Sequence, residues 1–277
     1  MRPAGRFSGT RFPGCRTRSA RKGNLVPENL PAGLILPIKT NPGSLQHFFR
    51  QFDIGGGLHP AFRLKDAVTP KQADLILRAG ADVITLGNHT WTRTELRPYL
   101  DERTRILRPG NYGPQCPGRG IAVYHKPFGD VCVLNLLGRF TLDNNTDNPF
   151  PIADGYMAEI QEKIILVDFH AEGTSEKRAM GYLLDGKASA VWGTHTHVQT
   201  SDAAVLPKGT GYITDLGMTG PIHSVLGIDP EQSIGKFMGD PPRRYESAKG
   251  PCKMEGCIFT IDTETGRCRS VEAVRLT

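Results

Sequence analysis

Apolar positions become regularly spaced only after residue 67, where helical and strand periods begin to alternate. Ala73, Ile76 and Leu77 recur at helical spacing, Thr69 is suited to the N-cap, and Gly80 closes the pattern. The apolar run 83–86 then predicts a short buried strand. Further strands are expected at 121–124, 131–136, 164–168, 189–192, 212–214, 255–262 and 268–275, with helices at 92–100, 158–163 and 174–186. Strands that alternate with helices indicate an α/β domain over residues 67–277.

Histidines follow three of the predicted strands directly. His89 comes after the strand 83–86 and is preceded by Asn88, His170 follows 164–168, and His195 and His197 follow 189–192. Because ligands of open α/β sheets bind beyond the carboxyl ends of the strands, these side chains are expected to converge. Imidazole nitrogens bind zinc, iron and manganese-like ions, and an amide oxygen suits the harder ones. Each signal is weak alone, but their common position favours a metal site.

Charge is distributed unevenly over the 277 residues. The net charge is +6, of which residues 1–66 carry +8 and the remainder −2, so the body of the protein gives no reason to expect nucleic-acid binding. No apolar run approaches the roughly 20 residues of a membrane helix, so no membrane association is expected. Six cysteines without a CxxC pair indicate reduced thiols and a cytoplasmic protein.

Residues 1–66 form an atypical basic segment. They contain only three acidic residues, Glu28, Asp53 and Asp66, and show no sustained helical or alternating period. Three interpretations compete: a disordered basic arm, a segment that superficially resembles a transit peptide, and a natural start replaced through a shifted reading frame or a misassigned initiation codon. For residues 1–22 we expect no packed face.

Four strings carry a family resemblance. They are GNHTW (87–91), DFHAEGTSEK (168–177), GTHTHVQT (193–200) and TDLGMTGP (214–221). Together they resemble the YmdB-like branch of the calcineurin-like metallophosphoesterases, over about residues 68–277. The resemblance implies a four-layer sandwich of two β-sheets flanked by helices. It also implies two metal ions, iron or manganese, and hydrolysis of phosphodiesters, notably 2′,3′-cyclic nucleotides.

The resemblance also implies individual roles for the site residues. Asn88, His170 and His195 match ligands of the second metal ion, and His197 matches a ligand of the first. His89 matches the histidine that protonates the leaving oxygen. These roles agree with two-metal phosphoester chemistry, in which the ions clamp the attacking oxygen and the phosphoryl group while an acid assists departure.

The N-terminal segment departs from the family pattern. Members begin with a strand and a Gly-Asp motif, and a second strand ends in Gly-Glu-Asn, whose Glu bridges the metals; neither string is present. When the family pattern is counted back without gaps from Asn88, the positions that hold this Glu and Asn in other members are occupied here by Pro60 and Ala61. The abrupt join near residue 67 favours the interpretation that the natural segment has been replaced. We therefore expect N-terminal strands that are missing or altered, and the loss of one metal ion.

The sequence thus predicts a metal-dependent phosphodiesterase that acts on 2′,3′-cyclic nucleotides or related phosphodiesters, impaired by the loss of N-terminal ligands. Two alternatives stay open. One is a phosphomonoesterase or nuclease with the same centre, because one fold hosts several activities. The other is a catalytically inactive regulatory relative. The expected partner is the phosphodiester substrate, and a homo-oligomer is also left open.

Overall fold

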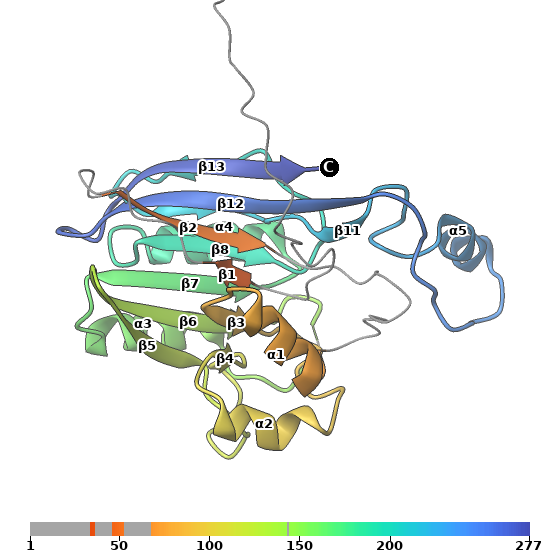
Figure 1. Ribbon diagram of the computed structural model, residues 1–277, viewed down its shortest axis with the longest axis horizontal. Helices are drawn as coiled ribbons and strands as arrows, with labels where there is room; N and C mark the ends of the chain where they lie inside the picture. The colour runs from red at the N-terminus through yellow and green to blue at the C-terminus, as the bar shows by residue number, and fades with distance from the viewer. Residues whose placement is uncertain (1–33, 37–45, 53–67, 143) are drawn as a thin grey trace, which may run out of the picture.

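The computed structural model describes residues 34–36, 46–52, 68–142 and 144–277 (Figure 1). One sheet contains β1 (Leu34–Leu36), β2 (Gln46–Phe52), β3 (Val83–Thr85), β4 (Ile106–Leu107), β11 (Thr219–Pro221), β12 (Cys252–Asp262) and β13 (Cys268–Leu276). The second contains β5 (Ile121–Lys126), β6 (Gly129–Leu137), β7 (Ile164–His170), β8 (Ala190–Thr194), β9 (Ala204–Val205) and β10 (Gly211–Ile213). The helices are α1 (Pro70–Arg78), α2 (Leu96–Glu102), α3 (Pro149–Glu159), α4 (Thr174–Leu183) and α5 (Pro230–Met238).

The strand orders show how the two sheets are built. In the described residues the first sheet runs β11-β12-β2-β1-β3-β4, with β13 paired to β12, and the second runs β5-β6-β7-β8-β10-β9. The strands β6, β7 and β8 are parallel neighbours, and the pairing places Leu137 beside His170 and His170 beside Thr194. Their carboxyl ends therefore meet at one edge of the second sheet.

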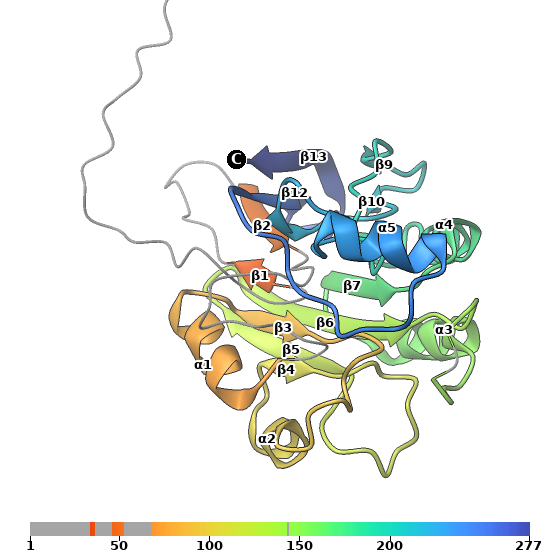
Figure 2. The same cartoon turned by 90° about the vertical axis from the view of Figure 1, so that its right-hand side faces the viewer.

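Three apolar clusters separate four layers. The first lies between the sheets and joins Trp192 of β8 to Phe259 of β12, with ring centroids 5.7 Å apart. The second covers the outer face of the second sheet with α3 and α4, and the third joins α1 and α2 to β3 and β4. Figure 2 accordingly shows α1 and α2 on one side of the molecule and α3 and α4 on the other. The four-layer sandwich expected from the family resemblance is confirmed.

The N-terminal segment contributes strands that the sequence analysis did not predict. β1 pairs antiparallel with both β2 and β3, and β2 pairs antiparallel with β12. Two strands therefore lie before residue 68, in a segment whose sequence shows no sustained period. Pairing is made by backbone groups that nearly every residue carries, so it needs no clear alternation of side chains. Residues 1–22, Glu28, Asp53, Pro60, Ala61 and Asp66 lie outside the described residues.

Capping determines where the helices begin. Thr69 caps α1, as the sequence suggested, and its side chain and that of Gln72 form the reciprocal pair of a capping box. The helix predicted at 158–163 is wrong, because α3 starts well before it, where the Asn148 side chain accepts a hydrogen bond from the Phe150 N–H. Among the described residues, no helix is long and apolar enough to span a membrane.

Truncating the aromatic contact between the sheets should destabilise the fold. The variant Phe259→Ala is expected to lose about 3–5 kcal/mol of unfolding free energy, because a fully buried ring is removed and a cavity is left behind. Phe237→Ala is the matched control, since Phe237 is 84% exposed on α5 and its loss should change stability by less than about 0.5 kcal/mol. Urea denaturation measures the unfolding free energy of both variants. Equal losses would contradict the packing of Phe259 between the two sheets.

Candidate metal centre

The predicted site residues lie at the carboxyl ends of three strands. His170 is the last residue of β7, His195 directly follows β8, and Asn88 lies three residues after β3. β7 and β8 are neighbours in the second sheet, whereas β3 belongs to the first. The site is therefore assembled from both sheets, at the edge where ligands of α/β sheets usually bind.

Polar atoms of these three residues converge. Nε2 of His170 lies 3.1 Å from Oδ1 of Asn88 and 3.1 Å from Nδ1 of His195. Gly87 permits this approach, because a Cβ at that position would overlap the His170 ring. The expected convergence of the three side chains is confirmed, while their role as metal ligands stays a prediction.

A carboxylate defines the protonation of His195. Its Nε2 lies 3.0 Å from Oε2 of Glu172. A carboxylate accepts hydrogen bonds and cannot donate them, so Nε2 carries the ring proton. In the neutral ring, Nδ1 then presents a lone pair to His170. Such carboxylate–histidine pairs commonly orient metal-ligating imidazoles.

A chain of hydroxyl groups defines the protonation of His170. Its Nδ1 lies 3.0 Å from Oγ1 of Thr194, whose hydroxyl donates to Oδ1 of Asp168 at 2.9 Å. The second carboxylate oxygen of Asp168 accepts from the Thr85 hydroxyl at 2.5 Å. Because Thr194 uses its proton on Asp168, its oxygen accepts the Nδ1–H of His170. Nε2 of His170 is consequently the lone-pair nitrogen.

The resulting arrangement fits a divalent ion. The two imidazole lone pairs face each other, the amide oxygen of Asn88 faces Nε2 of His170, and none of these three atoms carries a proton. Ligand bonds of roughly 2.0–2.2 Å place neighbouring ligand atoms about 3 Å apart, as observed here. Nitrogen ligands combined with an oxygen suit manganese or iron. The residues present therefore fit one ion.

Burial keeps the two histidines neutral. It lowers the pKa of His170 well below its ordinary value, and the neighbouring charges of His195 and Lys177 lower this pKa further. Burial also lowers the pKa of His195, although Glu172 opposes the shift. Both rings are thus deprotonated at one nitrogen at neutral pH, which is the form that binds metals.

The two remaining candidates lie beside this cluster. His89 is exposed in the turn after Asn88, and its charge contributes to the lowered pKa of His170. His197 is half-buried, with Nδ1 3.4 Å from the backbone oxygen of Leu226, and burial lowers its pKa. The structure thus brings three of the five candidates into direct polar contact and places two at the margin.

A buried ion pair behind the cluster was not predicted from the sequence. Nζ of Lys177 lies 2.6 Å from Oδ2 of Asp215, and both side chains are almost fully buried. The same carboxylate oxygen accepts hydrogen bonds from the backbone N–H and the hydroxyl of Thr196, the residue between His195 and His197. The sequence signal for this pair was that both residues fall within the strings that carry the resemblance.

Comparisons with known proteins show similarity over most of the chain. A family model described as YmdB-like protein matches residues 64–274. A 2′,3′-cyclic-nucleotide 2′-phosphodiesterase of Bacillus subtilis (strain 168) is 43% identical over 209 residues, which cover 75% of this chain and 79% of the relative. A crystal structure of a hypothetical protein from Thermus thermophilus has a TM-score of 0.71 and 37% identity, covering 76% of this chain and 81% of that one. A novel phosphatase from Mycoplasma pneumoniae has a TM-score of 0.71 and 34% identity, covering 76% of each chain.

Removing the buried cation should destabilise the protein. In Lys177→Met the Asp215 carboxylate keeps its charge in a dry environment, so we expect a loss of about 3–5 kcal/mol in unfolding free energy. Lys187→Met is the control, because Lys187 pairs with Asp154 on the surface and its loss should cost less than about 1 kcal/mol. Urea denaturation compares the two variants. A similar small loss in both would show that the fold does not depend on the buried pair.

Proposed function

Since this chain belongs to the YmdB-like family, we propose that it is a phosphodiesterase that hydrolyses 2′,3′-cyclic nucleotides. The observation that carries the proposal is the convergence of Asn88 and His195 on Nε2 of His170. The substrate class follows from the activity named for the Bacillus subtilis relative. A cluster of neutral nitrogen and oxygen donors beside the strand ends is suited to phosphoester chemistry that uses a metal ion.

The proposal includes a manganese or iron ion held by Asn88, His170 and His195. When bound, such an ion supplies Lewis-acid assistance to the phosphoryl group. The protein's contribution is to keep the two rings neutral and correctly rotated. Glu172 holds the proton on Nε2 of His195, and Thr194 accepts the proton on Nδ1 of His170. These contacts preserve the lone pairs that face the ion.

His89 is the proposed acid of the reaction. It follows Asn88 directly, so a substrate phosphate held at the cluster lies near its ring, and it is exposed enough to exchange protons with water. A protonated imidazole can donate to the departing alkoxide and then recover its proton from solvent. His197 is proposed to bind a second, weaker ion.

We further propose that the second ion is bound poorly and that turnover is slow. Within residues 68–142 and 144–277, no group of three or more His, Cys, Asp and Glu side chains is arranged to hold a metal. Glu172, the carboxylate that contacts the cluster, is engaged with His195. Two dications without a bridging carboxylate repel each other strongly, since even unit charges 4 Å apart repel by about 4 kcal/mol at an effective dielectric of 20.

Activity should depend on the cluster. The purified protein with added Mn²⁺ is expected to hydrolyse 2′,3′-cyclic AMP, and His170→Ala should lower kcat/KM by at least about 100-fold because a ligand is lost. His125→Ala is the control, since His125 lies exposed on β5 and pairs with Asp130. A monoester substrate, p-nitrophenyl phosphate, is assayed in parallel. Preferred hydrolysis of the monoester would favour a phosphatase, and no hydrolysis of either would favour an inactive relative.

Metal content tests the proposed ion directly. After incubation with Mn²⁺ and gel filtration, elemental analysis should find about one equivalent per chain, and about none in the double variant His170→Ala/His195→Ala. Two retained equivalents would contradict the expected loss of the second ion. It would also mean that another acidic side chain bridges the two ions.

A further inference from the structure

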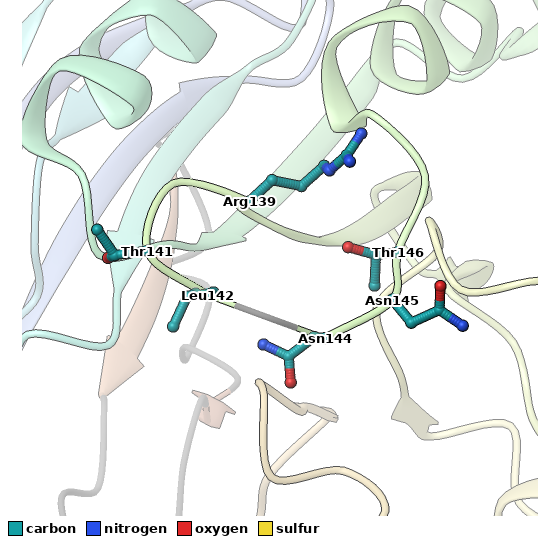
Figure 3. Close-up of a pocket in the computed structure, with 6 residues that line it drawn as sticks. All are labelled: Arg139, Thr141, Leu142, Asn144, Asn145 and Thr146. Atoms are coloured by element: carbon teal, nitrogen blue, oxygen red, sulfur yellow. The ribbon is translucent and has the colours of Figure 1, made fainter.

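We propose that the loop between β6 and α3 forms a subsite for the nucleoside part of the substrate. This inference rests on the proposed function, because it assigns the part of a cyclic nucleotide that the histidine cluster does not hold. The described residues of this loop line a cavity of about 460 Å³ (Figure 3). The described residues that line it are Arg139, Thr141, Leu142, Asn144, Asn145 and Thr146.

The cavity begins beside the end of β7, the strand that carries His170. Leu137, the last residue of β6, pairs in register with His170, and the N–H of Gly138 donates to the backbone oxygen of His170 at 2.9 Å. Arg139, the next residue, is the first that lines the cavity. One residue spans about 3.5 Å of extended chain, so the backbone of Arg139 lies within a nucleotide's length of the backbone of His170.

The base of the loop is held in place. Asn111, which is fully buried, accepts from the N–H of Leu137 at 2.9 Å and donates to its oxygen at 2.8 Å. The same amide donates to the oxygen of Asp147 at 2.9 Å, at the other end of the loop. The N–H of Arg139 donates to Oε1 of Glu176 at 2.8 Å. Both ends of the loop are therefore held in place, which lowers the entropy lost when a ligand binds.

A buried hydroxyl points to a ligand. The Thr146 side chain lines the cavity although the residue is only 9% exposed, and its Oγ1 has no hydrogen-bond partner among the described residues. Figure 3 shows this oxygen directed into the space that the loop encloses. A buried polar group without a partner is unfavourable, and such groups in native proteins call for an explanation. A ligand that hydrogen-bonds to Thr146 would remove this cost.

The lining chemistry favours a nucleoside over a simple anion. Asn144 and Asn145 can each donate and accept, and Arg139 supplies a fork of donors, which are the groups that read nucleobase edges. Arg139 is the single cation among the described lining residues, fewer than a site built for free phosphate would offer. The volume is within the range of small-molecule sites.

The test compares two cyclic phosphodiesters, of which only one has a base. In Thr146→Val the shape is retained and the hydroxyl is lost, so KM for 2′,3′-cyclic AMP should rise about 3- to 10-fold with little change in kcat. Arg139 is exposed, and Arg139→Gln should raise KM for 2′,3′-cyclic AMP by a similar factor. For both variants the rise should be smaller with glycerol 1,2-cyclic phosphate, which has no base. Thr219→Val is the control, because Thr219 has an equally buried hydroxyl in β11 of the other sheet.

A binding measurement separates this inference from the proposed function. Calorimetric titration with adenosine 3′-monophosphate should show binding to the unaltered protein and weaker binding to Thr146→Val and Arg139→Gln. That result supports the subsite even if no diester is hydrolysed, in which case only the proposed function fails. Equal affinity in all three proteins, or no binding to any, would overturn the subsite. Unchanged KM values in active variants would overturn it as well.

Discussion

The buried ion pair between Lys177 and Asp215 is the constraint on which the site geometry depends. A carboxylate in a dry environment must be compensated, and Asp215 is compensated by Lys177 and by both polar groups of Thr196. Thr196 lies between His195 and His197, whose φ angles are 102° and 62°. L residues enter this backbone region at a cost, so the surrounding contacts have to hold the loop there. Gly193 contributes by having no side chain, because a Cβ there would lie 2.7 Å from Cδ of Lys177.

A second constraint links the site to the packing of the two sheets. Thr85 comes from β3 of one sheet and Asp168 from β7 of the other, and their hydrogen bond starts the chain that leads through Thr194 to His170. Asn88 likewise reaches His170 from across the interface. The site exists only when the sheets are packed together. A change that loosens the packing of the two sheets should therefore also disturb the geometry of the histidine cluster.

The features that could be predicted from the sequence are those that depend on residues close together in the chain. The Thr69 cap, the strand ends and the positions of Asn88, His170 and His195 after those ends could all be read from spacing, because each depends on neighbouring residues. The ion pair could not, since Lys177 and Asp215 are 38 residues apart and a helical lysine is usually solvated. The strands β1 and β2 were missed because backbone pairing left no side-chain period to detect. The start of α3 was missed because the Asn148 cap was not recognised.

Hydrogen-bonding partners force one lone-pair nitrogen of His170 and one of His195 to face each other, and ¹⁵N NMR of the imidazole rings detects this arrangement. Long-range ¹H–¹⁵N spectra of the metal-free protein at neutral pH should show His170 protonated only at Nδ1 and His195 only at Nε2. Addition of Zn²⁺ should then shift Nε2 of His170 and Nδ1 of His195, the two nitrogens that lie 3.1 Å apart. Opposite tautomers in either ring, or shifts at the other nitrogens, would show that the two lone pairs do not face each other.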